Sequence, residues 1–192
     1  MRHGRLHTFL FADLVGFTAL AELNGDEAAA EVAIRFTEDA AKMAAEHGAS
    51  VVKRLGDAVM IHSRDAAESL LLGTRLRDER SAGMPPVHAG AHTGRAVERD
   101  GDWFGATVNL AARVTDVARG GELLVTEATV SAAGDVAGIE LDSLGPQAFK
   151  NVGTPTAVYS VRHVGAAPQR AAVPVAPAPA LVALPALSPS SA

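Results

Sequence analysis

The sequence predicts an α/β (α+β) fold in which helices cover a sheet that contains antiparallel strands. Short apolar, β-branched segments alternate with longer segments whose apolar residues recur at helical spacing. Gly56 and Asp57 separate two β-branched runs, a pattern typical of a hairpin. The expected order is strand, helix, helix, hairpin, helix, strand, helix, strand, strand, with no internal repeat.

The first strand is expected over residues 6–14, an apolar and aromatic segment followed closely by Gly16. Thr18 could cap the helix that follows. From Ala19 to His47 the pattern is helical, but Asn-Gly-Asp at 24–26 interrupts it, which predicts two helices or one broken helix. The remaining elements are expected in this order: a hairpin over 49–63, a helix over 64–80, a strand over 87–94, a loop continuing as a helix over 105–119, and strands over 122–130 and 156–164 joined by a loop and hairpin region.

Composition narrows the class of protein. The chain has 192 residues, enough for one domain with a core, and no cysteine, which excludes disulfides and Cys-based metal sites. A net charge of −5 and the absence of a basic cluster argue against a nucleic-acid partner. Without a secretory signal, a cytoplasmic protein is expected. The Pro/Ala-rich segment 165–192 is expected to be a disordered tail, and membrane contact by it is the weaker alternative.

Asp13 and Asp57 are the first candidate site residues. A single Asp at the end of a strand is usually a cap or turn residue. Here two of them stand at the tips of apolar strands with glycines nearby, so both carboxylates would meet at one sheet edge if the first strand lies beside the hairpin. Two carboxylates plus substrate phosphates suit Mg²⁺. The sequence therefore predicts a metal site.

The turn between Asp13 and the following helix contains Gly16, Phe17 and Thr18. A glycine turn into a helix N-terminus presents free backbone N–H groups to an anion, so these residues are predicted to bind phosphate. The spacing matches neither the P-loop nor the dinucleotide-binding fingerprint.

Three segments, "FADLVGFT", "VVKRLGDAVM" and "GDWFGATVNLAARV", resemble in order and separation the signature blocks of the class III nucleotide cyclases. The likeness covers roughly 6–164 and implies a catalytic domain over 1–164 with a ferredoxin-like βααββαβ palm sheet. It implies ATP as substrate, two Mg²⁺ or Mn²⁺ ions per site and a homodimer whose protomers share each site. The implied roles are metal binding for Asp13, Asp57 and the backbone of Leu14; purine recognition for Lys53 and Asp102; ribose orientation and transition-state stabilisation for Asn109 and Arg113; and terminal-phosphate contact for Lys150.

Hydrogen-bonding chemistry agrees with this resemblance. An ammonium donor at Lys53 and a carboxylate acceptor at Asp102 complement the acceptor and donor of adenine, whereas guanine reverses both roles. Taken alone, these two residues would be an exposed lysine and a turn residue. Arg113 follows Asn109 by one helical turn, so both side chains can point at one ligand. A further phosphate-binding arginine could be Arg95 or Arg99.

Other features have ordinary structural explanations. His88 and His92 are four residues apart on a strand and are interpreted as structural. Trp103 and Phe104 are expected to fill a core or a dimer interface rather than to stack on a base.

Three functions remain open: an adenylate cyclase producing cyclic AMP and pyrophosphate, a nucleotide-binding regulatory module with negligible turnover, and a dimerisation partner for another cyclase chain. Because both half-sites are present together, the sequence favours the enzyme and a homodimer.

Overall fold

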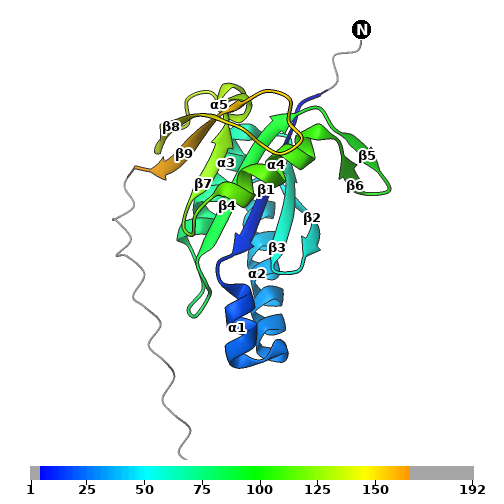
Figure 1. Cartoon of the computed structure of the whole chain (residues 1–192), viewed down its shortest axis with the longest axis vertical. Helices are drawn as coiled ribbons and strands as arrows, with labels where there is room; N and C mark the ends of the chain where they lie inside the picture. The colour runs from blue at the N-terminus through cyan, green and yellow to red at the C-terminus, as the bar shows by residue number, and fades with distance from the viewer. Residues whose placement is uncertain (1–4, 165–192) are drawn as a thin grey trace, which may run out of the picture.

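A seven-stranded sheet forms the centre of the protein, in the order β2-β3-β1-β4-β7-β9-β8 (Figure 1). The computed structural model describes residues 5–164, so the expected tail lies outside the described residues. The sheet strands are β1 (His7–Leu14), β2 (Ser50–Leu55), β3 (Ala58–Ser63), β4 (Val87–Gly94), β7 (Leu123–Thr126), β8 (Ile139–Gln147) and β9 (Thr156–His163). Only β4 and β7 pair in parallel; the other neighbours are antiparallel.

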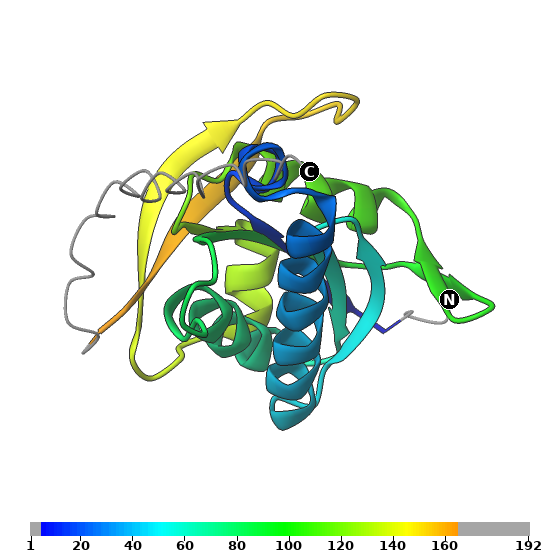
Figure 2. The ribbon, with the colours of Figure 1, turned by 90° about the horizontal axis from the view of Figure 1, so that it is seen from below.

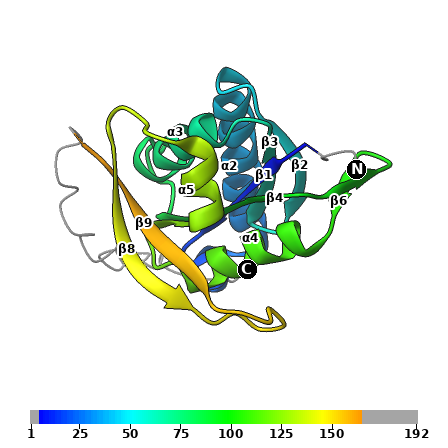
Figure 3. The ribbon, with the colours of Figure 1, turned by 90° about the horizontal axis from the view of Figure 1, so that it is seen from above.

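Helices lie on both faces of this sheet. They are α1 (Phe17–Asn24), α2 (Asp26–Glu46), α3 (Ala66–Asp78), α4 (Ala106–Val117) and α5 (Glu127–Ala133). Seen from above, α2, α3 and α5 lie on one side and α4 on the other (Figure 3). The view from below shows the long α2 helix running beside α3 (Figure 2). No helix within residues 5–164 is long and apolar enough to cross a membrane.

The first half of the chain has the predicted ferredoxin-like arrangement. After β1 come two helices, a hairpin, a helix and β4, and β1 lies between β3 and β4. The helical segment breaks at Gly25, as Asn-Gly-Asp indicated, because this glycine has a φ of 85° that other residues rarely adopt. The predicted fold class is confirmed.

Strand β1 has two different faces because successive side chains point in opposite directions. Leu10, Ala12 and Leu14 belong to the large core beneath α2 and α3. Phe9 and Phe11 belong to a second core with residues of α4. Asp13 continues the series of Phe9 and Phe11, so alternation directs its side chain to the α4 side of the sheet at the end of the strand.

Two predictions about individual elements were wrong, and one pair of strands was not predicted. Thr18 does not cap a helix, because α1 begins one residue earlier, with Gly16 at the N-cap position and no side-chain cap. The strand expected over 122–130 ends at Thr126, where the chain turns into α5 with Glu127 in its first turn, a favourable place for an acid. The segment around Asp102, for which no strand was predicted, forms a two-stranded sheet, β5 (Val97–Arg99) with β6 (Asp102–Phe104).

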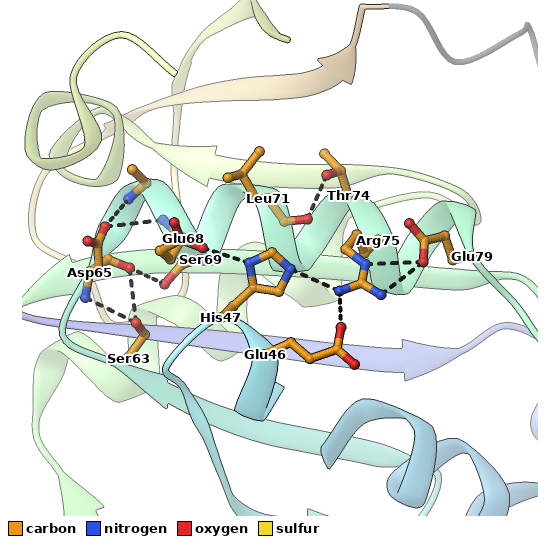
Figure 4. Close-up of polar contacts among 11 residues, drawn as sticks. Glu46, His47, Ser63, Asp65, Glu68, Ser69, Leu71, Thr74, Arg75 and Glu79 are labelled. Atoms are coloured by element: carbon orange, nitrogen blue, oxygen red, sulfur yellow. Dashed lines mark hydrogen bonds and ion pairs between the residues drawn. The ribbon is translucent and has the colours of Figure 1, made fainter. Parts of the chain in front are cut away.

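A polar network joins the end of α2 to α3 (Figure 4). Asp65 caps α3 by accepting hydrogen bonds from the backbone N–H groups of Ala67 and Glu68. His47 Nδ1 lies 2.7 Å from Glu68 Oε2, and Arg75 donates to Glu46 at 2.6 Å. These contacts hold α2 and α3 together on the side of the sheet away from α4.

Candidate functional site

Asp13 stands at the junction of β1 with α1. One oxygen of its carboxylate, Oδ1, accepts a hydrogen bond from the backbone N–H of Leu14 at 3.0 Å. Three residues after Asp13, Gly16 adopts a left-handed conformation with φ 74°, which turns the chain from the strand into α1. The chain therefore reverses directly after this acid and leaves its carboxylate at the end of the sheet.

Asp57 reaches the same place from the β2–β3 hairpin. Gly56 turns the hairpin with φ 70°, and Asp13 pairs across the strands with Ala58, the residue after Asp57. The two carboxyl groups interact directly: burial and the charge of Asp13 both raise the pKa of Asp57. The predicted meeting of the two acids at one sheet edge is confirmed.

His88 is a third member of this group. It pairs with Asp13 across β1 and β4, and its Nε2 atom lies 3.5 Å from Asp13 Oδ2. Burial opposes ionisation of Asp13, but the hydrogen bond and charge of His88, together with hydrogen bonds from Asp57 and the Leu14 backbone, outweigh that effect and lower the pKa of Asp13. His88 thus has a partner in the candidate site, whereas His92 has a structural partner, Thr126 Oγ1, at 2.7 Å.

The acid pair fits a hard divalent cation. Two carboxylates in contact repel each other when both are ionised, and a bound cation offsets this repulsion. Mg²⁺ binds one or two carboxylates and keeps water or substrate phosphates as its other ligands. Within residues 5–164 no group of three or more His, Cys, Asp or Glu side chains is arranged to enclose a metal ion.

The predicted phosphate-binding turn lies next to these acids. Phe17 and Thr18 are the first residues of α1, and N–H groups of a first helical turn have no acceptor within their own helix. No side chain caps this end of α1. Gly16, Phe17 and Thr18 therefore present a helix N-terminus beside the two carboxylates, and their binding of phosphate stays a prediction.

Lys53 and Asp102 form an ion pair across 49 residues of sequence. Lys53 Nζ, on β2, donates to Asp102 Oδ1 at 2.8 Å and to Oδ2 at 2.6 Å. The hydrogen bond from Lys53 holds the pKa of Asp102 below its usual range. The structure thus brings together the two residues predicted to read a purine.

Asn109, Arg113 and Lys150 line one cavity of about 440 Å³. The first two lie on one face of α4. Lys150 comes from the loop before β9, and this loop packs along α4. Arg113 donates to Asp116 at 3.1 Å, and both side chains stay exposed enough to meet a ligand. Neither Asp13 nor Asp57 lines this cavity, and neither Arg95 nor Arg99 does.

Known proteins share this fold and sequence. A protein named pH-sensitive adenylate cyclase from Mycobacterium tuberculosis is 36% identical over 161 residues, 81% of this chain and 40% of that protein. An adenylate cyclase from Streptomyces coelicolor is 39% identical over 123 residues, 62% of this chain and 32% of that protein. The adenylyl cyclase CyaB of P. aeruginosa superposes with a TM-score of 0.71 at 26% identity, covering 82% of this chain and 93% of that one. The chain belongs to the class III nucleotide cyclase family.

A structure from Silicibacter pomeroyi, titled adenylate/guanylate cyclase/hydrolase, is similar to this class III cyclase chain to the same degree. It is 27% identical and superposes with a TM-score of 0.71, covering 83% of this chain and 96% of that one. No family model matches the sequence. The chain spans 40% or less of the length of the two curated relatives described above.

The contact between His88 and Asp13 is a feature of this class III cyclase chain that the sequence did not predict. The place of His88 beside Asp13 depends on β1 and β4 being neighbours, although the two residues are far apart in the chain. Only a prediction of strand order together with register could have found it.

Proposed function

We propose that this chain is an adenylate cyclase that converts ATP to 3′,5′-cyclic AMP and pyrophosphate. In this reaction the ribose 3′-oxygen forms a bond to the α-phosphorus, the bond from that phosphorus to the β-phosphate bridging oxygen breaks, and pyrophosphate leaves. The curated relatives named adenylate cyclase support the reaction class. Solved relatives whose titles name guanylyl cyclases leave the choice of base to the residues of this chain.

The observation that carries the proposal is the contact between Asp13 and Asp57. With the backbone of Leu14, these carboxylates would hold two Mg²⁺ or Mn²⁺ ions. Bound there, the metal ions would supply Lewis-acid activation of the attacking hydroxyl and charge neutralisation of the leaving phosphates. Asp13 is held for this role by its bonds to Leu14 N–H and His88.

The α4 cavity would hold the rest of the nucleotide. Arg113 carries a fixed guanidinium suited to the charge that develops on the pentacoordinate phosphorus, and Asn109 would orient the ribose. Lys150, on the other wall, would bind the terminal phosphates. All three lie within one cavity, so a single ligand can contact them together.

Lys53 and Asp102 support ATP over GTP. An ammonium can donate to adenine N1 and a carboxylate can accept from the adenine amino group, while guanine would place a hydrogen-bond donor against the lysine and an acceptor against the acid. Unmatched polar groups of this kind discriminate strongly between ligands.

A second copy of the chain would complete each site. The acid pair does not line the cavity that holds Arg113 and Lys150. A two-fold homodimer in which the acids of one protomer face the cavity of its partner would contain two equivalent sites.

Turnover tests the proposal directly. Purified protein is incubated with ATP or GTP and Mn²⁺, and products are separated by chromatography, with Asp13→Asn as the blank. Cyclic AMP and pyrophosphate from ATP, in excess of cyclic GMP from GTP and absent in the blank, are expected. A folded dimer that binds ATP but forms no cyclic nucleotide would replace the proposal with a regulatory module.

A further inference from the structure

The β5–β6 hairpin, which carries Asp102, stands apart from the main sheet. It forms a separate two-stranded sheet and projects from the side of the molecule (Figure 1). Its turn uses left-handed conformations at Asp100 (φ 52°) and Gly101 (φ 79°). A hairpin of this size is marginal by itself, so its position depends on what anchors it.

Trp103 is that anchor. Its side chain is only 8% exposed, while the next residue, Phe104, is 51% exposed. The indole ring stacks on His62 of β3 with centroids 4.3 Å apart and an interplanar angle of 22°. It also lies 4.4 Å from the ring of His7 and meets Phe9 edge-on at 5.5 Å. The Trp103 side chain thus ties the hairpin to the central strands β1 and β3, in addition to the Lys53–Asp102 ion pair that ties it to β2.

The rings beneath Trp103 are suited to apolar packing. His7 Nδ1 lies 2.9 Å from His62 Nε2, so one ring donates to the other. Burial, with the nearby charges of His7 and Arg64, lowers the pKa of His62 to about 4. Near neutral pH this histidine is uncharged and stacks as an aromatic ring.

Trp103 also connects directly to the base-reading pair. Its backbone N–H donates to Asp102 Oδ1 at 2.8 Å. The same carboxylate accepts from Lys53 with both oxygens. A shift of the β6 backbone that accompanied loss of the indole packing would therefore move the donor that orients Asp102.

We propose that Trp103, seated on His62 and His7, is the positioning residue that determines purine selectivity. It does not touch the base; it fixes the hairpin so that Asp102 and Lys53 stand at the spacing of one purine edge. This inference rests on the proposed function. Displacements of about 1 Å can cost a hundredfold in activity, so a loosened hairpin would lose discrimination before it loses fold.

The test compares Trp103→Leu with Trp103→Phe, which keeps an aromatic ring. His62→Ala removes the stacking partner while leaving the hairpin sequence unchanged, so the test survives if Trp103→Leu fails to fold. Leu70→Ala is the control, because Leu70 is also buried, at 1% exposed, but lies in the other core. Trp103 is the only tryptophan in the chain, so a red shift of its emission in His62→Ala reports that the ring has loosened.

Two readouts are measured for each variant. The first is the preference for ATP over GTP. It is measured as the ratio of the two binding affinities, by calorimetry with Ca²⁺ in place of Mn²⁺, and as the ratio of the kcat/KM values for the two nucleotides. We expect a loss of at least about tenfold in ATP preference for Trp103→Leu, a smaller loss for His62→Ala, near-normal preference for Trp103→Phe and none lost for Leu70→Ala. The second is the pKa of Asp102 by carbon NMR, which should rise in Trp103→Leu as its backbone and Lys53 partners move away.

The outcomes separate this inference from the proposed function. If the wild-type protein prefers ATP in calorimetry but makes no cyclic nucleotide, the proposed cyclase activity is rejected. The role of Trp103 is then decided by the binding measurements on the variants. Unchanged preference and an unchanged pKa of Asp102 in folded Trp103→Leu or His62→Ala overturn the inference. Equal loss of preference in Leu70→Ala also overturns it, because the effect would then be general destabilisation.

Discussion

Gly90 of β4 lies against the backbone of Thr115 in α4. A Cβ atom at Gly90 would stand 2.3 Å from the backbone nitrogen of Thr115, so only glycine fits at this point of the strand. The contact sets how closely α4, with Asn109 and Arg113, approaches the sheet.

Gly90→Ala should therefore destabilise the fold and displace α4. We expect a loss of about 2 kcal/mol or more in the free energy of unfolding by urea, and loss of any cyclase activity. Gly153→Ala is the control, since a Cβ there meets nothing within 4 Å. Equal stability of Gly90→Ala and Gly153→Ala would contradict the close approach of α4 to β4 at Gly90.

Asp57→Asn should stabilise the metal-free protein while abolishing activity. Burial and the charge of Asp13 raise the pKa of Asp57, so the folded state disfavours its ionised form at neutral pH. The gain should be at most ~0.5 kcal/mol, because solvent screens groups this exposed. Thermal melts in a chelator measure it. Asp13→Asn is the matched comparison: the pKa of Asp13 is lowered, so its neutralisation should give no such gain.

Mixing two inactive variants tests the shared site. Asp57→Ala and Arg113→Ala proteins should each be inactive, but a mixed dimer retains one intact site. Random exchange of protomers makes half of the dimers mixed, so about a quarter of wild-type activity should return. Exchange is checked by pull-down of differently tagged chains. Exchanged dimers that remain inactive would rule out sites shared across the interface.

Acid should destabilise the protein through His92. Burial lowers the pKa of His92 to about 4, so this ring stays neutral in the folded state. Below its unfolded pKa of about 6.5 the unfolded chain binds a proton that the folded chain does not, and stability falls as the pH falls toward 4. This group alone should cost about 2 kcal/mol between pH 7 and pH 5. Urea unfolding of His92→Gln should show correspondingly less acid sensitivity, and identical sensitivity would refute the assignment.

Several parts of this arrangement were predictable from the sequence. The strand before Asp13, the helical break at 24–26 and the hairpin at Gly56 follow from local patterns, because hydrophobic period and turn chemistry act over a few residues. Spacing also indicated that Asn109 and Arg113 share one helix face, and they line one cavity.

The β5–β6 hairpin and α5 were not predictable from local pattern. β5 and β6 have three residues each, too few to show a period, and Trp103 is fixed by rings from distant strands. For α5, no turn residue separates the strand that ends at Thr126 from the helix that begins at Glu127, and the residues of α5 suit either a strand or a helix.

The sequence by itself determined which chemical groups this chain possesses: two strand-end acids, a lysine and an acid predicted to read a purine, and an asparagine and arginine on one helix. Only the tertiary structure decided which groups meet. His88 reaches Asp13 because β1 and β4 are neighbours, Lys150 joins the α4 cavity through a loop, and the acids stay out of that cavity. Such contacts depend on strand order and register, and these arise from burial of the whole sheet rather than from the preferences of neighbouring residues.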